Sequence, residues 1–352
     1  MKDTNQRLTK WAISKIEREY KDDVCLLVGY DLDGLEQNVA GGPFMYFKGG
    51  FDYYIPATDR AYSLAQTFIL DGIGYDLYPR SWERIEGMAD LEDYNTCCLA
   101  DATVLYARTD EDRARFEGYR QKLFDHLKDR TFMYKKALEK LDVAMGIYQT
   151  MMFSEKPGEV RMAAGFIADF LSVGVAFMNG TYFKHSQVNQ LVELASVKEI
   201  PDGFFHNYEA ILRATAMDEL KNLSHLMIFS TRKFFEMHKP PKTTASDPDF
   251  KNLAGWYQEL SYTWRRIYHS CYLGNIFRAF IWGCALQHEL EVICEEFGLE
   301  DIDLMGSYDA ADLKALENRA KELERYIVGT ITDNGESVDA YDTVEEFLEK
   351  NG

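Results

Sequence analysis

The sequence predicts an α+β protein, with a mixed sheet and flanking helices at the N-terminus followed by an all-helical bundle. The first 110 or so residues alternate short β-type segments with amphipathic helical segments, a pattern typical of a sheet covered by helices. Beyond that point, apolar residues recur with the helical period in one segment after another. We therefore expect a sheet domain over residues 1–128, a helical bundle over 129–330 and an acidic tail over 331–352.

The N-terminal part contains the candidate strands. Apolar spacing and turn residues predict a helix over 5–20, a buried strand over 24–30, one bulged strand or two pieces within 45–56, a helix over 59–71, a short strand over 72–79, a helix capped by Ser81, and a last strand within 98–108. Strands and helices in this order favour a sheet with helices on its faces.

The second part is helical throughout. Helical periodicity predicts helices near 110–128, 130–153, 158–178, 187–197, 204–238, 250–297 and 308–328. Prolines at positions 157, 201, 240, 241 and 248 mark the breaks between them. Aromatic residues stripe the segment 250–297, which suits a core or the interface of a homodimer formed through the helical domain.

Composition restricts the class of partner. The chain has 352 residues and a net charge of −19, so we do not expect a nucleic-acid partner, which calls for a basic face. A small or cationic ligand suits an acidic protein better. The sequence shows no apolar run of membrane-spanning length and no apolar leader, and its six cysteines are scattered without CxxC spacing. We expect a cytoplasmic protein with no membrane partner.

Two aspartates at predicted strand ends are the main candidates for chemistry. Asp52 lies in FDYYIP, and Asp76 lies 24 residues later in GYDLYP, again between an aromatic and an apolar residue. Two neighbouring strands that each place one carboxylate at the same level would hold Mg²⁺, which prefers oxygen ligands. The alternative is that both are ordinary strand-edge acids that face solvent or pair with Arg60 or Arg80.

The order of these parts resembles the nucleotidyltransferase (polymerase-beta-like) superfamily, and most closely its small-molecule branch of kanamycin and lincosamide nucleotidyltransferases. The segments similar to that family are KDDVCLLVGY, CLADATVLYARTDEDRARFEGYRQKL and VAFMNGTYFKHSQVNQLVELASVKEIPDGFF, within residues 5–235. The resemblance implies Mg²⁺-dependent transfer of a nucleoside monophosphate from an NTP to a small hydroxylated, aminoglycoside-like acceptor. It implies catalytic and metal-binding roles for Asp52 and Asp76.

Nucleotide binding would follow the first strand. The family has Gly-Ser there, where this chain has Gly29 and Tyr30, and the backbone after Gly29 would approach the phosphates. Asp31 and Asp33 come directly afterwards. They suit a turn or helix cap, or they supply a missing carboxylate if the inserted segment 31–50 folds back over the sheet.

The family's paired Asp-x-Asp is incomplete, because Tyr54 stands where the second aspartate is expected. A catalytically decayed protein, acting as a nucleotide-binding or protein-interaction module, is therefore the alternative to an active transferase.

Four residues are weaker candidates for substrate contacts: Tyr54, Glu83, Asn179 and Tyr182. Tyr54 belongs to a group of tyrosines that would stack on a base or sugar ring, with core packing as the alternative. An exposed helix face is the alternative for Glu83. A capped turn is the alternative for Asn179 and Tyr182.

Overall fold

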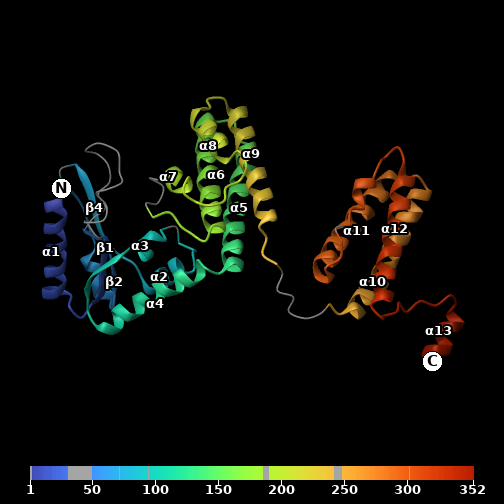
Figure 1. Cartoon of the computed structure of the whole chain (residues 1–352), viewed down its shortest axis with the longest axis horizontal. Coiled ribbons are helices and arrows are strands. Elements are labelled where there is room, and N and C mark those ends of the chain that lie inside the picture. Colours follow the sequence, from blue (N-terminus) through green and yellow to red (C-terminus); the bar gives the residue numbers. More distant parts are fainter. Residues whose placement is uncertain are drawn as a thin grey trace. The chain divides into compact units, whose positions relative to one another are not determined.

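The computed structural model describes residues 2–30, 50–70, 72–93, 95–184, 190–241, 248–300 and 302–352. The chain divides into two compact units, Met1–Pro241 (unit 1) and Lys242–Gly352 (unit 2) (Figure 1). The division falls within the range 129–330 that the sequence assigns to one bundle. Each side of it has its own buried core.

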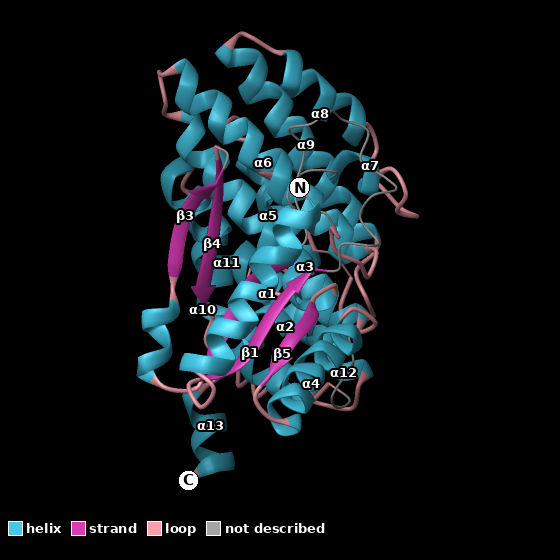
Figure 2. Cartoon of the chain, turned by 90° about the vertical axis from the view of Figure 1, so that its left-hand side faces the viewer, coloured by secondary structure: helices cyan, strands magenta, loops and turns pink. Residues whose placement is uncertain are grey.

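Unit 1 begins with a five-stranded mixed sheet in the order β3-β4-β2-β1-β5. Figure 2 shows strands of this sheet in magenta. The strands are β1 (Val24–Tyr30), β2 (Gly50–Pro56), β3 (Gln66–Leu70), β4 (Ile73–Pro79) and β5 (Thr103–Ala107). Strands β2 and β4 are parallel, and the other neighbours are antiparallel. This arrangement confirms the predicted mixed sheet.

Helices cover both faces of the sheet. Helix α1 (Lys2–Glu19) packs Ala12 and Ile16 against Leu27 and Tyr54 on one face. The opposite face is covered by α2 (Trp82–Ala89), α3 (Cys97–Ala100) and α4 (Asp110–His126). The hydrophobic core on that second face continues into the helical part of unit 1, so sheet and bundle share one core.

The predicted helix over 59–71 is wrong. The structure has a short 3-10 helix, η1 (Asp59–Leu64), followed by strand β3. Strand β3 forms a hairpin with β4, in which Leu70 pairs with Ile73. Gly72 has a φ of 77°, the backbone region that two-residue hairpin turns require. The turn and the pairing with β4 therefore override the helical spacing of the apolar residues.

The bundle of unit 1 contains α5 (Arg130–Met152), α6 (Pro157–Met178), α7 (Gln190–Leu194), α8 (Phe204–Arg213) and α9 (Met217–Met237). The predicted single helix over 204–238 is broken, because Ala214 and Ala216 have extended backbone. Among the described residues, α6 alone is long and apolar enough to cross a membrane, but 61% of its most apolar window is buried inside the protein. Such burial is usual for the core helix of a soluble protein.

Unit 2 is all-helical, with α10 (Phe250–Tyr272), α11 (Ile276–Phe297), the 3-10 helix η2 (Met305–Ser307), α12 (Leu313–Asp333) and a terminal α13 (Val344–Asn351). The predicted helix over 250–297 is two helices. Gly274, with a φ of 62°, ends the first, and the Asn275 side chain caps the second by accepting the Arg278 N–H.

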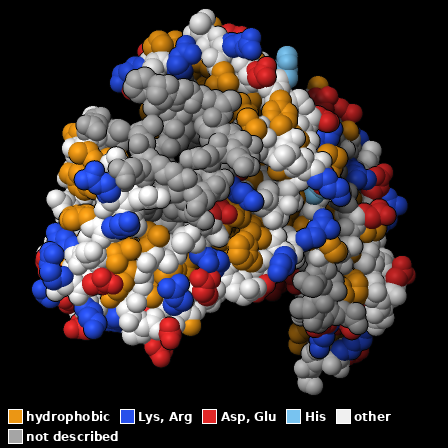
Figure 3. Space-filling model, turned by 60° about the vertical axis from the view of Figure 1, so that its left-hand side comes forward, with side chains coloured by type: hydrophobic (Ala, Val, Ile, Leu, Met, Phe, Trp, Pro, Cys, Tyr) orange, Lys and Arg blue, Asp and Glu red, His pale blue; other side chains and the backbone are white. Residues whose placement is uncertain are grey.

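Charges of both signs are mixed on the surface. Figure 3 shows Lys and Arg side chains interspersed with Asp and Glu side chains on one face. The net charge of −19 therefore does not make that face uniformly acidic, and the local charge around a site decides what binds there.

Candidate functional site

Asp52 is the extra residue of a β-bulge in β2. Val28 of β1 pairs with Tyr53, and the next residue, Gly29, pairs with Phe51, so Asp52 has no partner on β1. A bulge interrupts the alternation of side chains along a strand. Asp52 and Tyr53 thus both face α2–α4, while Tyr54 faces α1.

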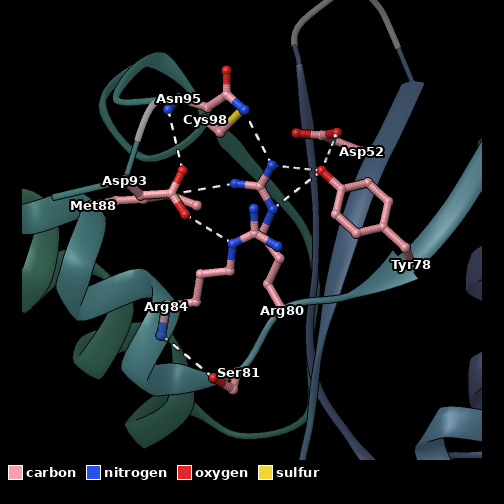
Figure 4. Close-up of polar contacts among 9 residues, drawn as sticks. All are labelled: Asp52, Tyr78, Arg80, Ser81, Arg84, Met88, Asp93, Asn95 and Cys98. Atoms are coloured by element: carbon pink, nitrogen blue, oxygen red, sulfur yellow. Dashed lines mark hydrogen bonds and ion pairs between the residues drawn. The ribbon is translucent and has the colours of Figure 1, made fainter. Parts of the chain in front are cut away.

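The Asp52 carboxylate belongs to a buried polar cluster (Figure 4). The Tyr78 hydroxyl donates to Asp52 Oδ1 at 3.2 Å and accepts from Arg80 Nη2 at 2.5 Å and Nε at 3.1 Å. Burial, together with the nearby Asp52 carboxylate, raises the pKa of Tyr78 above its ordinary value. The phenol therefore stays protonated and bridges a carboxylate and a guanidinium that form no direct ion pair.

Arg80 is 3% exposed and is held mostly by neutral groups. Its guanidinium lies 4.6 Å from the centre of the Tyr53 ring and hydrogen bonds the sulfur atoms of Met88 and Cys98. A guanidinium on an aromatic face gains cation–π stabilisation. From the sequence, Arg80 was expected only as an ion-pair partner for an aspartate. Its position directly after β4, two residues beyond Tyr78, was the one signal for this role.

Asp76 lies on β4 and is exposed, and it accepts a 2.7 Å hydrogen bond from the Thr67 hydroxyl of β3. Asp52 keeps Oδ2 buried without a hydrogen-bond partner, which is the kind of atom a cation would satisfy. Among the described residues, however, no group of three or more His, Cys, Asp and Glu could hold a metal ion. The described donors thus do not form a magnesium site by themselves.

The predicted nucleotide-binding residues are only partly described. Gly29 and Tyr30 end β1, where they pair with Phe51 and Gly50 of β2. Asp31 and Asp33, like the neighbouring Glu36, lie outside the described residues. The roles of all these residues, and of Asp52 and Asp76, stay predictions.

A cleft of unit 1 lies between the α3 region and the bundle. The space inside it that the centre of a water-sized sphere can reach is about 40 Å³, and the empty space is about 550 Å³ when open solvent is included. The α3 side contributes Asp93, Thr96 and Cys97, and the bundle side contributes mainly aromatic residues and Lys140 of α5. Clefts with apolar walls and a few polar groups are the usual form of small-molecule sites.

Lys140 is the residue of this cleft that sequence reasoning missed. Its side chain is half-buried, and its ammonium lies 5.9 Å from the centre of the Phe177 ring. Burial lowers the pKa of Lys140 below its ordinary value. A lysine within an amphipathic helix reads as a surface residue, so only the packing of α5 against α6 could reveal it.

The weaker substrate candidates have diverse surroundings. Tyr182 lines the cleft, where its hydroxyl donates to the Asp101 carboxylate at 3.0 Å. Asn179 caps the end of α6 and uses its amide to bond the backbone of Val175 and Glu199. Glu83 is exposed in the first turn of α2.

Tyr54 is fully buried, and its hydroxyl donates to the Ala61 carbonyl at 2.8 Å. Of the four weaker candidates, only Tyr182 lines the cleft.

Comparison with known proteins gives similarities to solved structures. No family model and no curated protein matches the chain. Among solved structures, it is similar to a nucleotidyltransferase-like protein from Exiguobacterium sibiricum 255-15, at 13% identity, with 65% of this chain and 74% of that chain covered and a TM-score of 0.35. A likeness at that TM-score carries no argument about function, so the proposals below depend on the residues of the cleft and of the Asp52 cluster.

Proposed function

We propose that this chain is a nucleotidyltransferase-like binding protein, and that a small molecule, with a nucleotide as first candidate, occupies the cleft between α3 and α5–α7 of unit 1. The observation that carries the proposal is the cleft itself, which combines aromatic walls with one lysine. We also propose a cytoplasmic location, because all six cysteines are free thiols.

The Asp52 cluster supports binding without metal-dependent transfer. Transfer by two metals needs several carboxylates that share the ions. Here Asp76 accepts a hydrogen bond from Thr67 on the neighbouring strand. The buried guanidinium of Arg80 is separated from Asp52 only by the Tyr78 hydroxyl, which hydrogen bonds to both. Positive charge so close to Asp52 opposes the binding of a divalent cation there.

A second candidate function is Mg²⁺-dependent nucleotidyl transfer to a small hydroxylated acceptor. The observation that favours it is the buried Oδ2 of Asp52, which has no hydrogen-bond partner. Bound Mg²⁺ would neutralise the phosphates of an NTP. Asp31 or Asp33 would have to complete the donor set with Asp52 and Asp76.

Two assays separate the candidates. Calorimetry with ATP, with and without Mg²⁺, measures binding, and an NTP labelled on its α-phosphate measures transfer to acceptors. Binding without labelling supports the first candidate. The transferase candidate is supported if the wild type labels an acceptor and the Asp52→Asn and Asp76→Asn variants do not. The control Asp59→Asn, at an exposed position, should label the acceptor like the wild type. If ATP does not bind at all, nucleotide binding and nucleotidyl transfer both fail, and either another small molecule fills the cleft or an interaction role, such as a homodimer through the helices, takes their place.

A further inference from the structure

We propose that the cleft of unit 1 selects an anionic ligand, a phosphate or carboxylate carried on a flat ring, and that the Lys140 ammonium pairs with the anionic group. This inference rests on the proposed binding function and names the class of ligand. It follows from the charge state of each polar group in the cleft.

Lys140 differs from the lysine one turn before it on α5. Lys136 is buried, and its ammonium lies 3.1 Å from Glu139 and 3.8 Å from Glu92. Lys140 has no carboxylate within 4.0 Å among the described residues, although Glu139 is its neighbour in sequence. A half-buried ammonium without a carboxylate in contact is costly, and burial lowers its pKa although the charge of Glu139 acts in the opposite direction. An incoming anion would remove that cost.

Three other polar residues of the cleft, Asp93, Tyr182 and Gln190, are already engaged. Asp93 accepts from Arg84 Nε at 2.8 Å and from the Asn95 N–H at 3.3 Å, and its pKa is lowered despite burial because of these bonds. The negative charge of Asp93 is thereby balanced by Arg84. The Tyr182 hydroxyl donates to Asp101.

Gln190 bonds both Asp169, at 2.6 Å, and the Tyr208 hydroxyl, at 3.1 Å. Lys140 is therefore the charged group among the described lining residues whose charge is left for a ligand.

The walls suit a flat apolar body. Phe170, Phe177, Tyr182 and Phe183 line the cleft beside Lys140. Aromatic walls stack on rings, and one cation fixes the orientation of a ligand that carries a single anionic group. The net charge of −19 favours a small or cationic ligand, but the local charge at Lys140 points to the opposite sign of ligand.

Calorimetry on the full chain tests the inference with four probes: AMP, adenosine, benzoate and kanamycin. We expect AMP to bind the wild type at least tenfold more tightly than adenosine, and Lys140→Met to abolish that difference. Lys135→Met, at an exposed position on the same helix, is the matched control and should bind AMP like the wild type. Benzoate shows whether a carboxylate replaces the phosphate.

The outcomes distinguish this inference from the proposed function. If kanamycin binds and AMP does not, or if AMP binds Lys140→Met as tightly as wild type, the cleft binds ligands but the anionic class is wrong. If no probe binds, both proposals are overturned. NMR of lysine labelled at Cε provides a second measurement, in which AMP must raise the pKa of Lys140 and leave that of Lys135 unchanged.

Discussion

Asp52 and Tyr54 lie two residues apart on β2, yet their side chains lie on opposite faces of the sheet. The Asp52 carboxylate accepts from Tyr78 on the α2–α4 face, and the Tyr54 hydroxyl donates to Ala61 on the α1 face. In a regular strand, residues two apart share a face, so the bulge at Asp52 produces this separation. Tyr54 therefore does not occupy the place of a second carboxylate beside Asp52.

An aspartate at position 54 should not create a metal site. Tyr54→Asp buries an unpaired carboxylate between α1 and the sheet, and we expect it to lower the free energy of unfolding by about 3 kcal/mol or more. Tyr54→Phe loses only the hydrogen bond to Ala61, worth about 1 kcal/mol. Urea unfolding measures both, and calorimetry should show no Mg²⁺ binding gained. An aspartate variant as stable as wild type that binds Mg²⁺ would contradict the assigned face.

The Tyr78 hydroxyl should be essential to the buried cluster. Tyr78→Phe leaves the Arg80 guanidinium with sulfur acceptors and aromatic faces, and leaves Asp52 without its donor. We expect a loss of about 2–4 kcal/mol in the free energy of unfolding, because charged groups are left unsatisfied. The control is Tyr75→Phe, which removes a longer bond, 3.3 Å, to Asn5. Equal losses in the two variants would contradict a special role for Tyr78.

Gly180 should be irreplaceable at the end of α6. It has a φ of 65°, and a Cβ there would lie 2.8 Å from the Leu127 carbonyl oxygen. Gly180→Ala should therefore lower the free energy of unfolding by about 2 kcal/mol, through backbone strain and this clash. Gly165→Ala, within the same helix and with open space around it, should raise stability by about 0.5–1 kcal/mol. Thermal unfolding of the pair should shift in opposite directions.

The loss in folding stability caused by the half-buried Lys140 ammonium should depend on pH. Burial lowers its pKa in the folded state, so between that pKa and the ordinary value of about 10.4 the unfolded state binds more protons. Stability therefore rises with pH in that window, and the penalty is fully present below it. Lys140→Met should be more stable than wild type at pH 7, and its advantage should shrink toward pH 10. Lys135→Met should show no such trend in parallel urea titrations.

Glu324 should hold the helices of unit 2 together. Its carboxylate accepts from the Tyr257 hydroxyl at 2.8 Å and the Tyr268 hydroxyl at 2.6 Å, and it pairs with Arg265. Glu324→Ala should cost about 2–3 kcal/mol, because two half-buried phenols lose their acceptor. Glu322→Ala, an exposed control on the same helix, should stay within about 0.5 kcal/mol of wild type. A similar loss in both would show that the network contributes little.

Local signals made part of the fold predictable. The buried strand β1 and the helices with apolar stripes follow from periodicity, and the Ser81 cap is present, with its hydroxyl accepting the Arg84 N–H. Strand β3 was missed because residues 66–70 form a strand by pairing with β4, which follows them in the chain. The spacing of apolar residues within 66–70 carries no information about that pairing. The breaks at Ala214 and Gly274 were missed because the apolar spacing continues across them.

The candidate site was less predictable than the fold. The sequence places Asp52 and Asp76 on strands, but only the bulge decides which face Asp52 occupies. The cleft is lined by residues that are far apart in sequence, such as Cys97 and Lys140. Neither a bulge nor an uncompensated lysine has a sequence signature, because both arise from packing between elements.

The bulge also indicates how Asp52 entered strand β2. Phe51 faces α1, Tyr53 faces α2–α4 and Tyr54 faces α1, so without Asp52 these three residues would alternate regularly. Asp52 thus has the geometry of an inserted residue, and no core side chain had to be replaced to accommodate it. A variant that lacks residue 52 altogether should still pair β2 with β1 in register. An alignment of this chain with its relatives should therefore allow a one-residue gap at position 52.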